Sequence, residues 1–485
     1  MIIPKEVKNI IDELKKAGFE AFIVGGCVRD FLRETEPEDW DIATNAKPEE
    51  IQKVFPNSFY ENNFLTVTVK TESKNSKLQE IEITTYRFEA RYSDKRHPDE
   101  IKFAKTIEED LARRDFTVNA IAVNIKGAKK EIIDPFLGQK DLKNKIIKTV
   151  GNPEERFSED ALRMMRAVRF ATTLGFKIED NTAKAIKKNG IWLKIISEER
   201  IRDEFLKIIM ADGAADGIEL LRELGLLKYI VPELEEGYGV SQNKHHIYDC
   251  YWHSIKALEY AAKKKFNMHV RLASLFHDIA KPRVKAGEGK EATFYNHEVV
   301  GAKMTFEILN RLKFSKKDVE KITKLVRYHL FYYNVDEVGE SSVRRLVRNV
   351  GQDSMEELLE VRHADRIGSG VPKAEPYKLR HLKYIIDKVS HDPISVKMLK
   401  VSGNDIINIL KIEPGPKIGQ ILDILLGYVL DNPKKNEKEI LEKEIEKLGK
   451  LEDKKLKSLS EKSKEEKTEI EIKTDQMTKK KYWVT

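Results

Sequence analysis

The spacing of hydrophobic residues changes along the chain at about Gly151. Between residues 19 and 133, short runs rich in β-branched residues, such as 21–24 and 65–69, are separated by turns and helical segments. Such alternation is typical of a mixed α+β unit. Beyond Gly151, apolar residues recur every three or four positions, as in 162–168, which predicts amphipathic helices. We therefore expect an α+β head followed by an all-α remainder.

The last part of the chain has a different pattern. Lys and Glu dominate from about residue 432, and aliphatic positions become rare after Leu456 and Leu459. This pattern predicts one solvated helix followed by a disordered tail.

Composition narrows the class of protein. The 485 residues suffice for about three domains, and 40% hydrophobic with 35% charged residues is not typical of a membrane protein. The net charge of +7 fits an acidic partner such as RNA, but also basic enzymes that bind no nucleic acid. The two cysteines, Cys27 and Cys250, lie far apart, and no signal-peptide stretch stands at the start. We therefore expect neither a disulfide framework nor a zinc knuckle, and a cytoplasmic location.

The first candidate site begins at a glycine pair. Gly25 and Gly26 follow the apolar run 21–24 and open a helical stretch, so backbone amides there can approach a phosphate. Asp39 and Asp41 are two apart in an extended segment, which places both carboxylates on one side. Paired carboxylates suit Mg²⁺, and two such ions can clamp the attacking and leaving oxygens of a phosphoryl transfer. The short distance between the two features favours a metal and phosphate site over an ordinary turn beside a surface Asp-x-Asp.

Four further motifs follow in order: LARRDFTVNA at 111–120, DP at 134–135, EDALRMMRAVRF at 159–170 and ERIRDE at 199–204. With the glycine and aspartate pairs, they resemble the class II CCA-adding enzymes and bacterial poly(A) polymerases over nearly the whole chain. The resemblance implies a polymerase β type nucleotidyltransferase head, followed by an all-α neck, an HD domain and a C-terminal helical region. It also implies addition and repair of the 3′-terminal CCA of tRNA from CTP and ATP, with release of pyrophosphate. Asp39 and Asp41 would then be the catalytic ligands of Mg²⁺ in a two-metal mechanism.

One residue pair points to selection of the base. Asp160 and Arg163 are three apart on an expected helix, so they share a face and offer one acceptor and a fork of donors. This pair matches cytosine and adenine, which present an amino donor beside a ring-nitrogen acceptor, and rejects uracil and guanine. The alternative is an intrahelical ion pair on a solvated face. Arg166 and Arg169 on the following turns favour the nucleotide site.

The resemblance implies further nucleotide contacts. They are Arg113 and Asp115 at the ribose, and Arg29, Arg114 and Asn119 near the triphosphate or the turn that holds it. A third metal carboxylate is expected at Glu82, on a strand beside that of Asp39. Glu80 shares its face through the two-residue period of a strand and stays an alternative.

A second constellation lies further along the chain. It consists of six residues of metal-ligand type: His253, His277, Asp278, His297, His329 and Asp365. Their order resembles the metal ligands of HD phosphohydrolases, and apolar spacing over 272–279 puts the His277-Asp278 pair on a helix. A mixed nitrogen and oxygen set suits manganese, cobalt or nickel, with Mg²⁺ as an alternative. The implied activity is hydrolysis of phosphate at an RNA 3′ end, and the alternative is a domain kept only for packing.

These motifs divide the chain into five expected regions. They are a catalytic head at 1–135, a neck for base selection and RNA binding at 136–236, an HD domain at 237–370, a helical tRNA-binding region at 371–450 and the charged tail at 451–485. In the fourth region, the glycines and lysines of 401–407, 414–419 and 432–436 either approach an RNA backbone or turn between packed helices.

Alternative functions share parts of this chemistry. Poly(A) polymerases of the family usually lack the second constellation and the segment 402–405, and enzymes that add only CC usually lack the loop 91–102. Both features are retained here. Alarmone synthetase and hydrolase proteins carry the hydrolase first, the reverse of this order. We therefore expect CCA addition to tRNA by a monomer or homodimer that contacts no membrane, with poly(A) synthesis or partial A-only or CC-only addition as the alternatives.

Overall fold

The computed structural model describes residues 3–61, 66–90, 100–127, 129–243, 247–335, 337–370, 377–390 and 396–484. The chain forms two compact units, the first of residues 1–330 with 356–372 and the second of residues 331–355 with 373–485. Most of the loop 91–102 lies outside the described residues.

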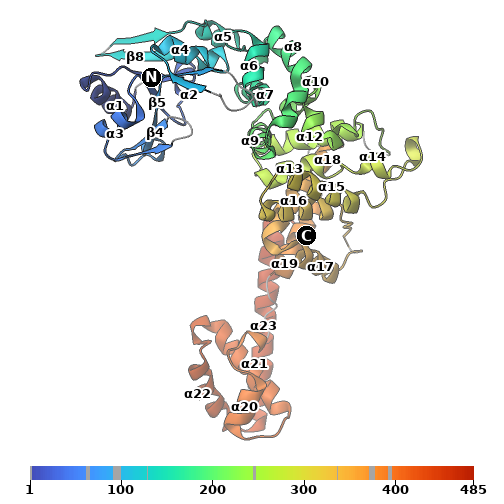
Figure 1. Ribbon diagram of the computed structural model, residues 1–485. Coiled ribbons are helices and arrows are strands. Elements are labelled where there is room, and N and C mark those ends of the chain that lie inside the picture. The colour runs from blue at the N-terminus through green and yellow to red at the C-terminus, as the bar shows by residue number, and fades with distance from the viewer. Residues whose placement is uncertain are drawn as a thin grey trace. The chain divides into compact units, whose positions relative to one another are not determined.

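The head of unit 1 is built on a seven-stranded sheet in the order β3-β4-β5-β2-β1-β8-β9 (Figure 1). Its strands are β1 (Ala21–Val24), β2 (Asp41–Thr44), β3 (Ser58–Glu61), β4 (Thr66–Lys70), β5 (Glu80–Thr85), β8 (Ala122–Lys126) and β9 (Lys129–Ile133). Neighbouring strands are antiparallel except for the parallel pair β2 and β5. A separate hairpin joins β6 (Arg87–Ala90) and β7 (Glu100–Phe103).

Both faces of this sheet are covered, as the alternation of residues along β1 illustrates. Ile23 joins one apolar cluster, with α1 (Lys5–Lys16) and α3 (Pro48–Val54) (Figure 1). Phe22 and Val24 join the opposite cluster, which includes residues of α4 (Ile107–Ala112). Successive side chains of a strand point to opposite faces, so this apolar run serves two cores. The α+β character predicted for the head is confirmed.

The rest of unit 1 is almost entirely helical. Its longer elements are α5 (Gly138–Asn144), α6 (Pro153–Glu159), α7 (Leu162–Leu174), α8 (Asp180–Asn189), α9 (Glu198–Ile209), α10 (Ala214–Glu223), α12 (Cys250–Lys263), α13 (Met268–Phe276), α15 (His297–Arg311), α16 (Lys316–Tyr328) and α18 (Met355–Gly368). The helical prediction for residues after Gly151 is confirmed apart from β11 (Lys177–Ile178), which pairs with β10 (Ile146–Ile147).

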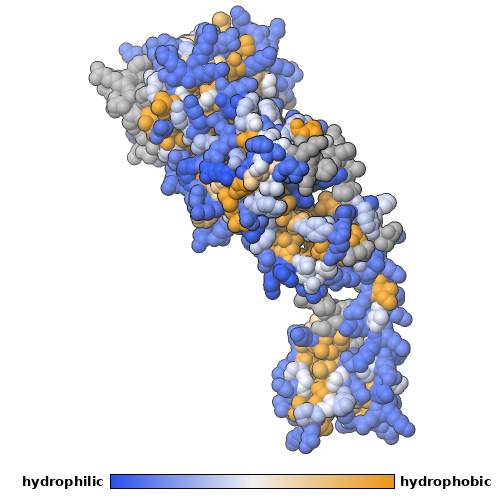
Figure 2. All heavy atoms as spheres, turned by 90° about the vertical axis from the view of Figure 1, so that its right-hand side faces the viewer, coloured by the Kyte–Doolittle hydropathy of each residue, from blue (hydrophilic) through white to orange (hydrophobic). Residues whose placement is uncertain are grey.

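Unit 2 is also helical. It contains α17 (Glu340–Val350), α19 (Tyr377–Ser390), α20 (Gly403–Leu410), α21 (Pro416–Asp431), α22 (Lys438–Gly449) and α23 (Asp453–Tyr482). Hydrophilic side chains cover most of the molecular face in view, as expected for a chain with 35% charged residues (Figure 2). None of the helices in the described part of the chain combines the length and apolar character that a membrane span needs.

The tail differs from the sequence expectation, because residues 453–482 form α23 and are not disordered. Leu456 and Ser460 are buried in its first turns, and Tyr384 of α19 donates a hydrogen bond to the Asp475 carboxylate. Ion pairs four residues apart, such as Lys467 with Glu471, support its solvated side. Charge content alone therefore gave the wrong expectation, since a few buried contacts anchor this helix.

Candidate active site

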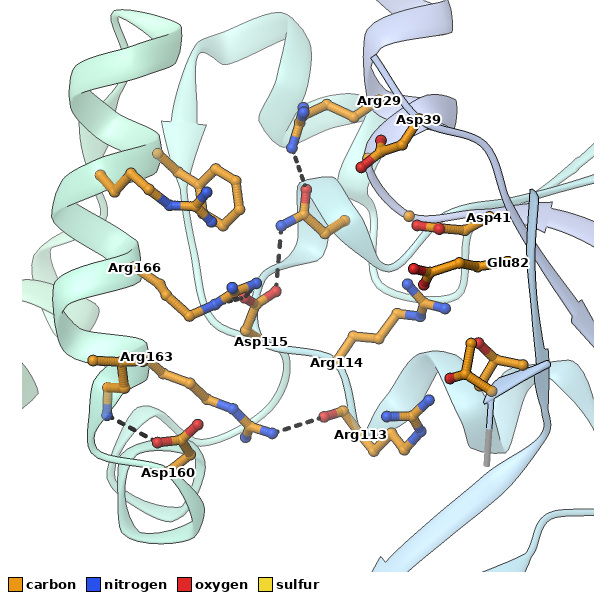
Figure 3. A pocket seen from close by; sticks show the side chains of 18 of the residues that line it. Arg29, Asp39, Asp41, Glu82, Arg113, Arg114, Asp115, Asp160, Arg163 and Arg166 are labelled. Carbon is orange, nitrogen blue, oxygen red and sulfur yellow. Dashed lines mark hydrogen bonds and ion pairs between the residues drawn. The ribbon is translucent and has the colours of Figure 1, made fainter. Parts of the chain in front are cut away.

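A cavity of about 530 Å³ in unit 1 gathers most of the residues of the first predicted site. Its charged lining consists of the arginines 29, 87, 113, 114, 163, 166, 169 and 200 and the carboxylates of Asp39, Asp41, Glu82, Asp115 and Asp160. Asp39, Asp41 and Glu82 lie on the side of the sheet, opposite Arg163 and Arg166 of α7 (Figure 3). Arginines outnumber carboxylates, so the cavity suits a polyanion such as a nucleoside triphosphate.

Strand pairing brings the three carboxylates of the sheet together. Asp41 is the first residue of β2 and lies directly opposite Glu82 of the parallel strand β5. Asp39 precedes it by two residues, and the intervening Trp40 is buried in the core. Glu80, the alternative left open by the sequence, is paired with Lys70 and does not line the cavity. The structure therefore places Glu82 beside the aspartates.

The electrostatics of these carboxylates favour a cation. Burial, together with the negative charges of Asp39 and Glu82, raises the pKa of Asp41 to about 7, and the Arg114 guanidinium opposes this rise. A divalent ion would relieve the repulsion between the carboxylates. Their oxygens fit Mg²⁺, which binds one or two carboxylates and completes its shell with water and substrate phosphates.

The glycine turn is shaped by close contacts. Gly25 has φ of +78°, and a Cβ atom there would lie 2.8 Å from Nη1 of Arg114 and 3.6 Å from Oδ2 of Asp41. Both the backbone conformation and the small space favour glycine. Gly26 begins α2 (Gly26–Leu32), whose first amides therefore lie next to the carboxylates.

A chain of hydrogen bonds connects α2 to α7 through Asp115. Arg29 donates to Oδ1 of Asn119 at 2.8 Å, Asn119 donates to Oδ1 of Asp115 at 3.3 Å, and Arg166 donates through Nε to Oδ2 of Asp115 at 2.8 Å (Figure 3). Burial alone would raise the pKa of Asp115, but Arg166 and Arg163 bring it down to about 2. Asp115 is thus a buried anion with both oxygens engaged, and its predicted contact with a ribose stays a prediction.

The pair expected to read the base is arranged differently from the prediction. Asp160 has φ of −145° and lies between α6 and α7, so it does not share a helical face with Arg163. Its oxygens accept hydrogen bonds from the amide of Leu162 at 3.0 Å and from Arg200 at 2.7 Å. Asp160 follows the last residue of α6, and α7 begins two residues later at Leu162, after Ala161. Both residues still line the same cavity.

Arg163 is held by partners of its own. It forms an ion pair with Glu159 and donates to the carbonyl oxygen of Arg113 at 3.2 Å (Figure 3). Glu159, the last residue of α6, thus pairs with Arg163 of α7 across two helices, and Asp160 pairs with Arg200.

Arg87, Phe170 and Arg200 line the cavity but were not among the predicted site residues. Phe170 of α7 has the guanidinium of Arg169 at 4.1 Å from its ring centroid, with those of Arg29 and Arg166 both at 5.4 Å. Arg169 also pairs with the buried Glu204 of α9 at 2.8 Å. The motif 199–204 was visible in the sequence, but only the packing of α7 on α9 shows which of its residues face the cavity.

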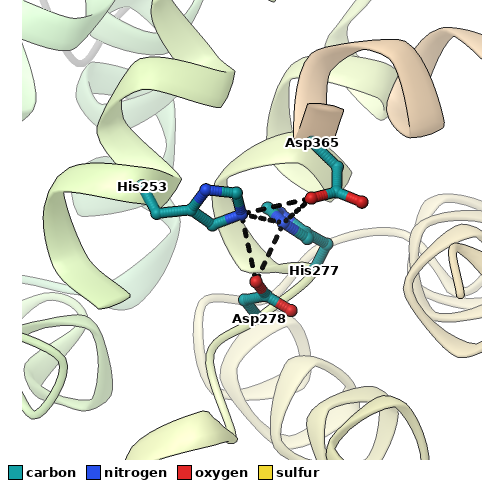
Figure 4. Close-up of side chains that lie close together, drawn as sticks. All are labelled: His253, His277, Asp278 and Asp365. Atoms are coloured by element: carbon teal, nitrogen blue, oxygen red, sulfur yellow. Dashed lines mark hydrogen bonds and ion pairs between the residues drawn. The ribbon is translucent and has the colours of Figure 1, made fainter. Parts of the chain in front are cut away.

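The second constellation also converges, in a buried place among helices of unit 1 (Figure 4). Nε2 of His253 lies 3.0 Å from Oδ2 of Asp278 and 3.3 Å from Oδ1 of Asp365, and Nε2 of His277 lies 3.3 Å and 3.5 Å from the same oxygens. The His277-Asp278 pair was expected on a helix, but α13 ends at Phe276, so the pair lies just beyond its end. These four residues form one potential metal site.

The remaining two histidines complete a second group around the same aspartate. Nε2 of His297 and Nε2 of His329 lie 3.3 Å and 3.6 Å from Oδ1 of Asp278. Each of the two carboxylate oxygens of Asp278 therefore faces one of the two groups of ligands. All six predicted ligands are brought together, and a shared carboxylate of this kind suits two neighbouring ions.

The orientation of the histidine rings favours metal binding. Nδ1 of His277, His297 and His329 lies 2.7–2.8 Å from a backbone carbonyl oxygen of its own segment. Since a carbonyl oxygen only accepts, each Nδ1 carries the proton and each Nε2 is left as a potential ligand. The nitrogen and oxygen donors fit a borderline transition metal.

Comparison with known proteins identifies the family. Residues 21–148 match the Poly A polymerase head domain, residues 175–237 match the RNA and SrmB-binding site of polymerase A, and residues 294–445 match domain 2 of the tRNA nucleotidyltransferases. The CCA-adding enzyme of Ligilactobacillus salivarius is 34% identical over 462 residues, which cover 92% of this chain and 98% of that protein. The chain belongs to the CCA-adding enzyme family. The enzyme of this family from Enterococcus faecalis is 32% identical, over 90% of this chain and 94% of that protein.

Solved structures agree with this membership. The CCA-adding enzyme of Bacillus stearothermophilus, solved in complex with CTP, is 28% identical and superposes with a TM-score of 0.59, over 92% of this chain and 98% of that one. The Thermotoga maritima CCA-adding enzyme complexed with tRNA, at 19% identity, a TM-score of 0.51 and coverage of 92% and 96%, shares the fold. The predicted family is confirmed. His253, His277 and Asp278 lie outside the three matched ranges, so the HD domain stays a prediction.

Proposed function

We propose that this member of the CCA-adding enzyme family adds and repairs the 3′-terminal CCA of tRNA without a nucleic acid template, using CTP and ATP and releasing pyrophosphate. The observation that carries this proposal is the cavity that combines Asp39, Asp41 and Glu82 with eight arginines and with Asp160. A metal-binding carboxylate set and a base-reading group thus face the same space, as a template-independent transfer requires.

The residues have separate tasks in this reaction. Asp39 and Asp41, with Glu82, would hold Mg²⁺, which when bound supplies neutralisation of the triphosphate charge and activation of the attacking 3′ hydroxyl. Gly25 and Gly26 allow the phosphates to approach the first amides of α2. This arrangement aligns the α-phosphate with the tRNA end by positioning and electrostatics.

Base choice is assigned to Asp160, which lies between α6 and α7, and to Arg163 of α7. The Asp160 carboxylate accepts a hydrogen bond from the exocyclic amino group of cytosine or adenine, and Arg163 donates to the adjacent ring nitrogen. UTP and GTP would place a carbonyl oxygen opposite the carboxylate. This contact is unfavourable because both oxygens are hydrogen-bond acceptors. The expected contacts of Arg113, Arg114, Arg166 and the other arginines with the ribose and triphosphate belong to the same proposal, as do tRNA, CTP and ATP as partners.

The test is stepwise extension of a tRNA transcript that lacks its last three nucleotides. CTP alone should add two nucleotides, ATP alone none, and both together three. On a transcript that lacks only the final A, ATP alone should add one nucleotide. Long extension with ATP alone would instead indicate a poly(A) polymerase, and an arrest after CC with both nucleotides a partial enzyme.

A second activity is favoured by the buried histidine and aspartate groups. We propose that residues 237–370 form a metal-dependent phosphohydrolase that acts on phosphate at an RNA 3′ end, with manganese, cobalt, nickel or magnesium. A bound ion would supply a Lewis acid and lower the pKa of a water molecule. The protein, loaded in turn with each metal, should hydrolyse a 2′,3′-cyclic nucleotide or a generic phosphodiester, and Asp278→Asn should not. If no metal supports hydrolysis by the wild type, the cluster serves packing only.

A further inference from the structure

We propose that Asp110 is a positioning residue of the nucleotidyltransferase, which sets the directions of the arginines expected at the ribose and triphosphate. This inference rests on the proposed CCA addition and concerns the same cavity. Asp110 does not line the cavity itself, and it acts through Arg87, Arg113 and Arg114, which do.

One carboxylate binds all three of these residues. Oδ1 of Asp110 accepts from Nε of Arg113 at 2.9 Å and lies 2.8 Å from its Nη2. Oδ2 accepts from Nη2 of Arg114 at 3.3 Å, and Oδ1 also accepts from the backbone amide of Arg87 at 3.4 Å. Arg87 is the first residue of β6, so Asp110 also anchors the base of the β6–β7 hairpin.

Local helix geometry explains the contacts. Asp110 lies in α4, and Arg113 and Arg114 follow it by three and four positions, the spacing at which side chains meet along a helical turn. Asp110 is only 1% exposed, so its charge needs partners. Burial raises its pKa, yet the two guanidiniums hold that pKa below its ordinary value, so the carboxylate stays ionised at neutral pH.

The contact with Asp110 also places Arg114 near the carboxylates that would bind metal. With Nη2 tied to Asp110, Arg114 extends Nη1 to 2.8 Å from the position that a Cβ of Gly25 would take, beside Asp41 (Figure 3). Arg113, 16% exposed, also lines the cavity. A flexible arginine that is fixed before the nucleotide arrives loses less conformational freedom on binding.

The test measures how nucleotide concentration affects addition. Asp110→Asn removes the charge and one of the two acceptor oxygens, so Arg113 and Arg114 lose their fixed directions. A misplacement of about 1 Å at a site of this kind can reduce catalysis by about a hundredfold, and we expect KM for CTP and for ATP to rise by at least about tenfold. Because neither arginine is expected to read the base, the ratio of kcat/KM between CTP and UTP should not change. The KM for tRNA should also stay constant.

Two further measurements separate positioning from general damage to the fold. Asp141→Ala, which removes a 2.7 Å hydrogen bond from Thr117 in the same unit, should leave KM for nucleotides unchanged. In an Arg113→Lys background, Asp110→Asn should raise KM by a smaller factor than in the wild type, because both changes disturb the same contact. If Asp110→Asn does not fold, Asp110→Glu is measured with the same expectations.

Unchanged nucleotide KM in a folded Asp110 variant would overturn the inference. It would also be overturned if KM in the double variant rose by the product of the factors measured for the two single variants. In both cases the wild type, measured in parallel, still reports on the proposed function. A wild type that adds nothing to tRNA would instead refute CCA addition itself.

Discussion

Replacing Asp160 with alanine should change which nucleotides are accepted rather than how well triphosphates bind in general. The carboxylate is held by the amide of Leu162 at 3.0 Å and by Arg200 at 2.7 Å, so its direction is fixed before a base arrives. Its remaining acceptor capacity faces the cavity, where the amino group of cytosine or adenine would donate.

The expected loss of kcat/KM follows from the charge on the Asp160 carboxylate, which is the hydrogen-bond acceptor. A hydrogen bond to a charged group contributes about 1.5–3 kcal/mol, which corresponds to a fall of about 10-fold to 150-fold in kcat/KM for CTP. UTP makes no such bond and is relieved of a repulsive contact between two acceptors. Its kcat/KM should therefore stay constant or rise, and the CTP to UTP ratio should fall by at least the factor lost for CTP.

The assay is single-nucleotide addition to tRNA that lacks its last three nucleotides, with kcat/KM measured for all four triphosphates. Asp180→Ala is the matched control, because this exposed carboxylate at the start of α8 does not line the cavity. Far-UV circular dichroism checks that loss of the contact with the start of α7 leaves the helices intact. A fall by the same factor for every nucleotide would refute base reading by Asp160 and leave the ion pair with Arg200 as its role.

The remaining predictions concern metal binding and stability. Asp39→Asn and Asp41→Asn should reduce addition to background with an unchanged circular dichroism spectrum, and near wild-type rates in either variant would remove the metal assignment. The pKa of Asp115 is depressed from 3.8 to about 2, so its charge should contribute about 2 kcal/mol of stability that is present above about pH 4 and lost as pH falls toward 2. The difference in unfolding midpoint between wild type and Asp115→Asn should accordingly shrink between pH 7 and pH 3, whereas a constant difference would contradict the pairing with Arg166. Manganese or nickel should raise the melting temperature of the wild type more than that of Asp278→Asn, and equal shifts would argue against the buried metal site.

Local patterns predicted the sheet side of the cavity well. The period of two placed Asp39 and Asp41 together, and the same reasoning reduced the third carboxylate to Glu80 or Glu82. Only strand register could decide between them, because it pairs Glu82 with Asp41. Register depends on contacts between distant segments, which single-strand periodicity does not contain.

The arrangement of residues on the helical side of the cavity was not predicted from the sequence. The pattern of residues 159–170 suggested one continuous helix, but α6 ends at Glu159 and α7 begins at Leu162. The Asp160 carboxylate between them accepts a hydrogen bond from Arg200. Asp110 stood in the acidic run Glu108-Glu109-Asp110, which reads as a solvated first turn. Its burial follows from the packing of α4 on the sheet, which the spacing of residues within α4 does not reveal.

The most direct test of CCA addition is sequencing of tRNA 3′ ends after incubation of the purified protein with tRNA that lacks CCA and with all four triphosphates at equal concentration. The account predicts that extended molecules end in CCA and grow no further, and that Asp41→Asn extends none. Ends that carry runs of A, or U and G as often as C and A, would contradict it.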